Sequence, residues 1–202
     1  GRHQVGNAPY SYYVYQQLYD AEGMPIQNAF VDRNGDGSIN DADRYCAGDP
    51  NPDFYYGLNV KLSYKNWDFG FNGHGNVGYT VYNAFGAMNS TTYFDANQGH
   101  LPNFAQVVKQ TGFTAVNDTY QYMTDLFIED ASFFKIDNVT LSYRFNLGKA
   151  MDRDLTLDLF GTVSNVATFT GYKGIDPEIF SGIDNNMYPR PRTYILGVKF
   201  NF

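Results

Sequence analysis

The residues with the clearest chemical potential form one oxygen-rich loop in the first quarter of the chain. Oxygen-bearing residues stand at positions 1, 3, 5, 7, 9 and 12 of a calcium-loop pattern, namely Asp32, Asn34, Asp36, Ser38, Asn40 and Asp43. Gly37 fills the sixth position, where the backbone must turn sharply. Ser38 would contribute its backbone carbonyl, and Asn40 would act through a water molecule. The spacing therefore predicts a Ca²⁺ ion with a structural role.

Two departures from the pattern keep a metal-free interpretation open. Asp43 stands where a longer glutamate is usual, so its carboxylate is expected to bind through one oxygen and more weakly. No helical pattern flanks the loop, so it is not a full EF-hand. In the alternative interpretation, the pairs Asn34-Gly35 and Asp36-Gly37 serve only as turn formers.

Other residue types offer little catalytic chemistry. The three histidines, His3, His74 and His100, lack a metal-ligand spacing, and Cys46 has no second cysteine with which to form an internal disulfide. Residues 73–78 fit the G-x-G-x-x-G fingerprint, but they continue a strand pattern, whereas dinucleotide binding needs a helix to begin there. We therefore expect no enzymatic activity.

Composition limits the classes of partner. The 202 residues carry a net charge of −7, which disfavours nucleic-acid binding because phosphate contacts need a basic face. Aromatic residues make up 18% of the chain and charged residues only 17%, a balance compatible with a membrane barrel. No run approaches the roughly 18 consecutive apolar residues of a transmembrane helix, but alternating strands can cross a membrane without such a run.

The elements that must position these residues are predicted by a period-two alternation of apolar and polar side chains. Five stretches show it: Tyr56–Tyr64, Trp67–Tyr79, Asn138–Asn146, Leu155–Ser164 and Thr193–Phe202. Lys65-Asn66 and the segment 147–154 predict hairpin turns, and a weaker strand is predicted over Tyr10–Tyr19. Stretches of about ten residues suit a tilted strand that crosses hydrocarbon, whereas soluble strands average about 5–6.

The connections sort by length. If the C-terminus faces the periplasm, the turns 65–66 and 147–154 are periplasmic, and the long segments near 20–54, 80–135 and 167–192 are extracellular. Outer-membrane barrels show this asymmetry, and a soluble sandwich has no reason to show it. The predicted fold class is therefore all-β, an antiparallel transmembrane β-barrel segment of about 5–6 long strands with long extracellular loops.

A second hypothesis is a secreted, calcium-stabilised β-sandwich that binds carbohydrate. The two hypotheses differ in the surroundings of the apolar row that includes Leu141, Leu157 and Val198. In a barrel this row faces lipid, whereas in a sandwich it is buried against a second sheet.

Side chains of the long segments could serve either binding or packing. Eight aromatic residues could stack on sugars or dock a partner, although packing between loops is the simpler interpretation: Tyr82, Phe85, Tyr93, Phe94, Tyr120, Tyr122, Phe169 and Tyr172. Arg190 and Arg192 are expected to brace the extracellular rim through carboxylates.

An ordered series of motifs carries a family resemblance. The motifs are D-R-N-G-D-G-S-I-N-D-A-D-R at 32–44, G-D-P-N-P-D-F at 48–54, Y-G at 56–57, Y-K-N-W-D at 64–68, I-E-D-A-S-F at 128–133, K-I-D-N-V-T-L-S-Y at 135–143, Y-K-G-I-D-P-E at 172–178 and Y-P-R-P-R-T-Y at 188–194. In this succession the chain resembles the C-terminal third of SusC/RagA-type TonB-dependent transporters of Bacteroidetes.

The resemblance implies a barrel of about 22 strands with an N-terminal plug, located in the bacterial outer membrane. It also implies a SusD-like lipoprotein lid on the extracellular side, energy supplied through TonB, and import of oligosaccharides or oligopeptides. Because five or six strands cannot close such a circumference, residues 1–202 are interpreted as the C-terminal portion of the barrel, without the plug. The expected partners are the remainder of the same barrel, the SusD-like lipoprotein, TonB through the plug, the substrate and membrane lipid.

Overall fold

The computed structural model describes residues 5–92, 103–114, 119–150, 153–185 and 188–202. The chain divides into two compact units. Unit 1 comprises residues 1–51, 78–131 and 172–188, and unit 2 comprises residues 52–77, 132–171 and 189–202. Within the described ranges, none of the helices has both the length and the apolar character needed to cross a bilayer.

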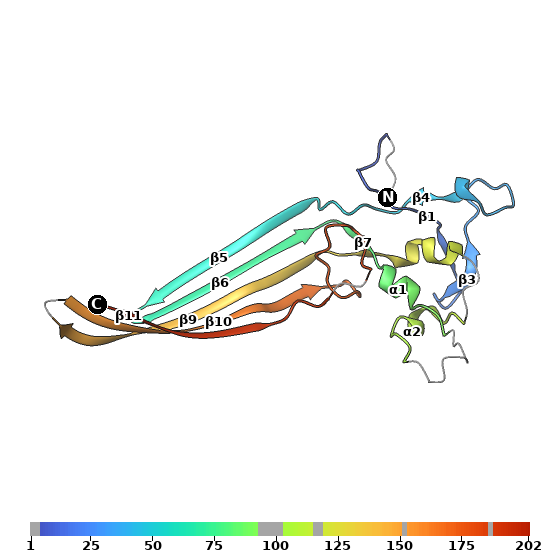
Figure 1. Ribbon diagram of the computed structural model, residues 1–202. Helices are drawn as coiled ribbons and strands as arrows, with labels where there is room; N and C mark the ends of the chain where they lie inside the picture. The colour runs from blue at the N-terminus through green and yellow to red at the C-terminus, as the bar shows by residue number, and fades with distance from the viewer. Residues whose placement is uncertain (1–4, 93–102, 115–118, 151–152, 186–187) are drawn as a thin grey trace. The chain divides into compact units, whose positions relative to one another are not determined.

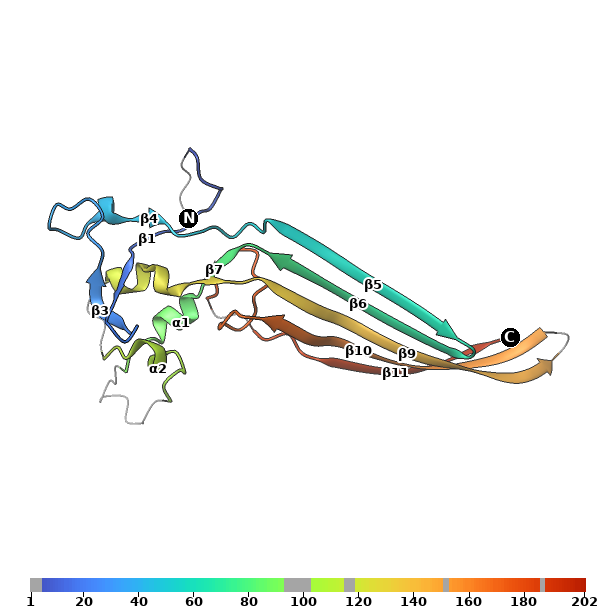
Figure 2. The ribbon, with the colours of Figure 1, turned by 180° about the vertical axis from the view of Figure 1, so that it is seen from behind.

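Unit 2 is one five-stranded antiparallel sheet, which Figures 1 and 2 show from its two sides. Its strand order is β11-β10-β9-β6-β5. The strands are β5 (Phe54–Tyr64), β6 (Trp67–Val77), β9 (Phe133–Ala150), β10 (Arg153–Thr170) and β11 (Thr193–Asn201). All five predicted alternating stretches are therefore strands of one sheet, and both predicted hairpins are present.

The strands β9 and β10 are longer than the sequence pattern predicts. Each has 18 residues, because pairing continues at both ends, to Ala150 and Arg153 across most of the segment expected to be a turn, and to Phe133 and Thr170 at the other end. The pairing absorbs irregularities at Leu155/Thr156 and Ser164/Ala167 on β10, and at Asn72/Gly73 on β6. Bulges add residues without breaking the ladder, so the apolar alternation alone underestimates these strands.

The apolar row of the sheet is exposed. Leu141 and Leu159 each expose 47% of their surface, and Val198 exposes 55%. Among the residues that the structure describes in unit 2, no second layer covers these side chains, which is what the barrel hypothesis expects and the sandwich hypothesis does not. The exposed row and the opposite polar row are the arrangement expected of a strand with lipid on one side and water on the other.

Aromatic rings and backbone carbonyls of neighbouring strands explain two of the glycines of β6, Gly73 and Gly75. A Cβ at Gly73 would lie 2.9 Å from the ring of Phe134, and a Cβ at Gly75 would lie 2.6 Å from the ring of Tyr56. These two rings lie nearly parallel, 3° apart in plane, with centroids separated by 6.0 Å. The glycines therefore make room for aromatic side chains of neighbouring strands, and the G-x-G-x-x-G run lies in a strand through Val77, as expected.

Unit 1 is built from short elements. Its strands are β1 (Tyr13–Val14), β2 (Gln17–Tyr19), β3 (Pro25–Phe30), β4 (Tyr45–Cys46), β7 (Thr80–Tyr82) and β8 (Ile128–Asp130). Its helices are α1 (Ala84–Met88), α2 (Val108–Thr111) and the 3₁₀ turns Asp41–Asp43, Thr119–Met123 and Asp125–Phe127. The strands pair as β1-β4, β2-β3 and β7-β8. The strand predicted over Tyr10–Tyr19 is thus two short strands.

The core of unit 1 mixes apolar and polar side chains. Tyr15, Val81, Phe113 and Phe127 are buried together with polar groups such as Gln121. Gln121 donates to the side-chain oxygen of Gln17 at 3.0 Å, so that a buried amide is satisfied by another buried amide. The long connections of the sheet are therefore folded structure with a core of their own.

Candidate functional site: the oxygen-rich loop and the polar face of the sheet

The structure holds the oxygen-rich loop as a series of tight turns in unit 1. The carboxylate of Asp32 accepts the backbone N–H groups of Gly35 and Gly37, both at 2.7 Å. Both glycines have positive φ, at 73° and 80°, which explains why glycine stands at these positions. The turn-forming function of the two glycine pairs is therefore present.

Asp43 is the last residue of the 3₁₀ turn that ends the loop, and it forms a capping box with the N-cap residue, Asn40. It is fully buried, and its oxygens accept backbone N–H groups from Asn40 at 2.8 Å, Arg33 at 2.9 Å and Asn34 at 3.3 Å. The N–H of Asn40 is the main group that lowers the pKa of the Asp43 carboxyl, so this side chain stays ionised. A carboxylate offers about four acceptor sites, which leaves about one for a cation.

Asp36 lies at the centre of the loop. Its Oδ2 accepts from the side-chain amides of Asn34 at 2.9 Å and Asn40 at 3.2 Å, and its Oδ1 accepts from the N–H of Ser38 at 2.8 Å. The Asn34 amide is the main cause of its lowered pKa. The six predicted residues thus share one loop, but no group of three or more His, Cys, Asp or Glu side chains is gathered to hold a metal within the described ranges. Calcium binding stays a prediction.

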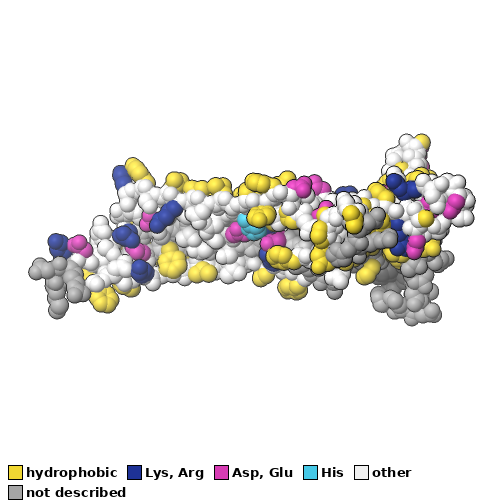
Figure 3. Space-filling model, turned by 90° about the horizontal axis from the view of Figure 1, so that it is seen from above, with side chains coloured by type: hydrophobic (Ala, Val, Ile, Leu, Met, Phe, Trp, Pro, Cys, Tyr) yellow, Lys and Arg dark blue, Asp and Glu magenta, His cyan; other side chains and the backbone are white. Residues whose placement is uncertain are grey.

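The polar face of the sheet is a connected hydrogen-bond surface across neighbouring strands. We define it by the polar row opposite the apolar one: Asn59, Lys61, Ser63, Asp68, Asn72, Asn138, Thr140, Ser142, Arg144, Asp158, Thr162, Lys199 and Asn201. Asn59 donates to Asn72, which in turn donates to Asn138 at 2.8 Å. The Thr140 and Thr162 hydroxyls lie 2.9 Å apart. In Figure 3, polar and charged side chains of both signs occupy this view of the sheet.

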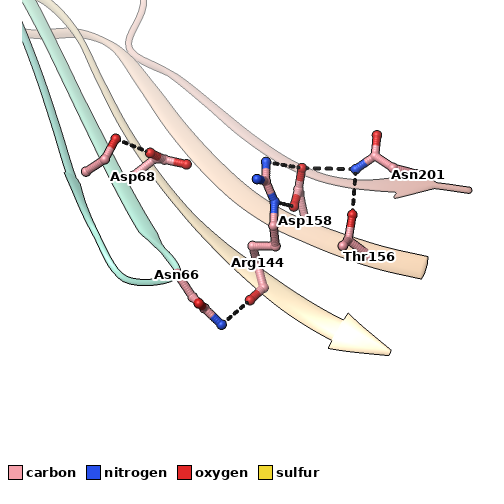
Figure 4. Close-up of polar contacts among 7 residues, drawn as sticks. Asn66, Asp68, Arg144, Thr156, Asp158 and Asn201 are labelled. Atoms are coloured by element: carbon pink, nitrogen blue, oxygen red, sulfur yellow. Dashed lines mark hydrogen bonds and ion pairs between the residues drawn. The ribbon is translucent and has the colours of Figure 1, made fainter. Parts of the chain in front are cut away.

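An ion pair and a hydrogen bond join β9, β10 and β11 at the end of the polar face that lies near the β5–β6 hairpin turn (Figure 4). Arg144 forms a bidentate ion pair with Asp158, in which Nε donates to Oδ1 at 2.7 Å and Nη2 donates to Oδ2 at 3.2 Å. Asn201 donates to Asp158 at 3.3 Å and to Thr156 at 3.1 Å, and Asn66 donates to the carbonyl of Arg144 at 2.8 Å. The arrangement therefore fixes the alignment of β9, β10 and β11.

At the opposite end of the sheet, His74 contacts Asp137 at 2.8 Å and packs edge-on against Phe133. Asp137 is the extra residue at the bulge between β6 and β9, since Asn72 pairs with Asn138 while Gly73 pairs with Ile136. The bulge therefore brings the acid to the histidine. This pair was not predicted from the sequence, because the two residues are far apart in the chain.

The rim segment is braced differently from the expectation. Arg192 donates to the backbone carbonyls of Val166 at 2.6 Å and Asn165 at 3.3 Å, so it uses carbonyls where carboxylates were expected. Asn165, at the bulge of β10 with a φ of 53°, returns a bond to the carbonyl of Arg190 at 2.7 Å. The two segments thus hold each other through reciprocal bonds.

Loop aromatics mostly pack within their own unit. Tyr172 is buried, and the hydroxyl of Tyr82 donates to the carbonyl of Tyr122. Phe169 lies in β10 and stacks with Phe134 at 6.3 Å. Phe85 is exposed by 37%. Two of the eight, Tyr93 and Phe94, lie outside the described residues.

Comparisons with known proteins bear on the family resemblance. No protein-family model matches the chain. The TonB-dependent receptor SusC of Bacteroides thetaiotaomicron is 42% identical over 205 residues, which cover 99% of this chain and 20% of SusC. The chain is SusC-like along its whole length. The SusC-like chain is also 31% identical to the TonB-dependent receptor P26 of Formosa agariphila, over 93% of the chain and 21% of that receptor.

A solved structure confirms the fold. The RagAB peptide transporter matches the SusC-like chain with a TM-score of 0.67 and 18% identity, over 95% of this chain and 23% of the other. The fold class is therefore a segment of an antiparallel transmembrane barrel. The similarity to SusC places the chain in the bacterial outer membrane. These relatives are receptors and transporters rather than enzymes, in agreement with the expected lack of enzymatic activity. The chain spans about a fifth of the length of the curated relatives it matches.

Proposed function

We propose that the SusC-like chain forms part of the wall and the extracellular loops of a TonB-dependent nutrient importer. The observation that carries this proposal is the exposed apolar row opposite a connected polar face, since a barrel wall separates lipid from an aqueous lumen. The imported substrates would be oligosaccharides or oligopeptides, a SusD-like lipoprotein would cover the loops, and TonB would act through a plug outside residues 1–202.

Uptake by cells tests the proposal. We expect cells with the full-length receptor to accumulate labelled oligosaccharides or oligopeptides, and cells that lack the receptor or TonB to lose that uptake. A SusD-like lipoprotein should co-purify with the receptor in detergent. Unchanged uptake after removal of the receptor would contradict the proposal.

The assignment of residues 1–202 to the C-terminal portion of a larger barrel has its own test. The five-stranded sheet leaves β5 and β11 at its edges, where the remainder of the barrel would pair. We expect the intact mass of the receptor purified from its native membrane to be several times 22.9 kDa. A native subunit of that smaller mass would contradict the assignment.

The oxygen-rich loop is proposed to bind a structural Ca²⁺ that fixes this part of unit 1. The order of its oxygen-bearing residues supports the proposal, and the ionised, buried Asp43 would supply one oxygen. We expect calorimetry of the full-length receptor to show calcium-dependent heat that Asp32→Ala together with Asp36→Ala removes. Absence of calcium heat in the unaltered receptor would refute the site, and the turn interpretation would then account for the loop alone.

A further inference from the structure

Four aromatic rings form a continuous band at the end of the sheet where β5 and β9 begin and β10 ends (Figure 1). We define the ring band by Phe54, Tyr56, Phe134 and Phe169. Successive rings have planes within 19° of parallel, and their centroids are 5.9, 6.0 and 6.3 Å apart. Tyr56, Phe134 and Phe169 lie in one cross-strand register, in which Gly75 of β6 separates the first two. The four rings therefore make one aromatic surface that crosses the sheet.

The ring band lies on the same side of the sheet as the exposed apolar row. Tyr56 shares its face of β5 with the exposed Leu58, because the two residues are two positions apart in one strand. Phe54 and Phe169, at the two ends of the band, expose 61% and 58% of their surfaces. The band lies at the end of β5 and β6 opposite to their hairpin turn, which is expected on the periplasmic side. We therefore expect it at the extracellular interface of the bilayer, where aromatic side chains are enriched.

Arg192 places a positive charge beside the ring band. Its Nε and Nη2 donate to the backbone carbonyls of Asn165 and Val166, which hold the guanidinium against the bulge of β10. Val166 precedes Phe169 by three residues, or about 10 Å along an extended strand. Arg192 is exposed, and the two bonds leave its Nη1 group available as a donor. Within the described ranges no carboxylate bonds to Arg192, so its charge is open to an outside anion.

The arginine and the rings fit different parts of one lipid molecule. The planar guanidinium matches the oxygens of a phosphate group, to which it donates paired hydrogen bonds. The exposed rings match the first methylene groups of acyl chains, because burial of apolar surface favours that contact. A soluble anion would gain nothing from the rings, and an uncharged lipid would leave the arginine without an anion. A phosphate-bearing lipid satisfies both groups, since its headgroup and its chains are covalently joined.

We infer that the ring band and Arg192 bind a phosphate-bearing lipid of the extracellular leaflet, with the phosphate on the guanidinium and the acyl chains against the rings. The inference rests on the proposed placement of the sheet as a barrel wall. It adds a lipid of defined headgroup chemistry, at a defined place, to the general contact that any barrel wall makes with a bilayer.

Native mass spectrometry of the full-length receptor, purified in detergent and stripped of lipid, tests the inference. The probe is dioleoylphosphatidylglycerol. Dioleoylglycerol supplies the same chains without the phosphate, and inorganic phosphate supplies the anion without the chains. We expect the receptor to retain the phospholipid and neither of the other two compounds. Arg192→Gln should weaken retention about fivefold, and Arg192→Lys should restore part of it.

The ring band has a separate variant, which leaves the bonds of Arg192 intact. Phe169→Leu keeps an apolar side chain but removes one ring, and it should weaken retention about threefold. Its matched control is Phe200→Leu, because Phe200 is an exposed aromatic residue of the apolar row at the other end of β11. The control for the charge is Lys199→Gln, which removes a cation from the polar face. Both controls should retain the phospholipid as the unaltered receptor does.

Four results would overturn the inference. They are no retention of the phospholipid, equal retention of dioleoylglycerol, displacement of the phospholipid by inorganic phosphate, and retention that Arg192→Gln and Phe169→Leu weaken no more than the two controls do. A receptor dimer that forms only without the lipid, and that Phe169→Leu dissociates, would assign the band to a second copy and would also overturn it.

Cellular uptake separates failure of the lipid site from failure of the proposed function. If the phospholipid is not retained while the unaltered receptor supports TonB-dependent uptake, the importer stands and the lipid site falls. If the phospholipid is retained through Arg192 while the receptor supports no TonB-dependent uptake, the lipid site stands and the importer proposal is wrong.

Discussion

At the scale of single residues, two glycines on neighbouring strands differ in what a methyl group would meet. A Cβ at Gly75 would lie 2.5 Å from the carbonyl oxygen of Phe133, whereas no atom lies within 4 Å of a Cβ at Gly57. We expect Gly75→Ala to lower the free energy of unfolding of the full-length receptor by about 1–3 kcal/mol through overpacking, and Gly57→Ala to leave it nearly unchanged. Urea unfolding in detergent, followed by electrophoretic mobility, measures both; equal midpoints would contradict the close contact.

Asn165 provides a second prediction at this scale, because it combines a φ of 53° with a side-chain bond to the carbonyl of Arg190. Asn165→Gly keeps the left-handed conformation accessible and loses only the bond. Asn165→Ala loses the bond and also forces a Cβ into that conformation, at a further cost of about 1–2 kcal/mol. The alanine variant should therefore unfold at the lower urea concentration, and the reverse order would show that the backbone conformation is unimportant here.

At the scale of elements, the two faces of β9 should respond differently to the same charged side chain. Leu141 lies in the exposed apolar row, and Thr140 lies on the polar face. Leu141→Arg should cost about 2–4 kcal/mol near the middle of the bilayer, because a charge enters hydrocarbon. Thr140→Arg should cost far less, since Gly70 opposite it leaves space and the face is polar. Equal yields of assembled receptor from the two variants would contradict the assignment of Leu141 to the lipid-facing side and Thr140 to the water-facing side.

The sequence predicted the strands of the sheet, but it did not predict the side-chain contacts that depend on how neighbouring strands pair. Alternation identified β5, β6, β9, β10 and β11 because each strand has one apolar face, and that local signal needs no tertiary information. It could not reveal the bulge that brings Asp137 to His74, since a bulge depends on the register with the neighbouring strand. The bond from the N–H of Lys173 to the Glu129 carboxylate was also missed, because these two residues meet only after distant segments fold together.

At the scale of the whole molecule, the described parts of the long connections fold into unit 1, which has a buried core of its own. Unit 1 buries tyrosines whose hydroxyls bond to backbone carbonyls, as Tyr12 does to Gly182 at 2.6 Å and Tyr79 does to Pro177 at 2.7 Å. Burial raises the pKa of both phenols and raises the pKa of Tyr82 to about 12. The neutral phenol is therefore the form that stabilises unit 1.

The sign of the resulting pH dependence follows from the unfolded chain, where tyrosine has a pKa of about 10. Below that pH the stabilisation is fully present, and as pH rises from about 10 towards 12 the unfolded state loses protons first, so unit 1 loses stability. Each such tyrosine adds at most about 1.4 kcal/mol per pH unit to the slope. Phenolate absorbance of the full-length receptor should thus show a late, cooperative rise, and Tyr82→Phe should make the alkaline loss of stability shallower. A slope unchanged by Tyr82→Phe would mean that this buried hydroxyl does not control the alkaline transition.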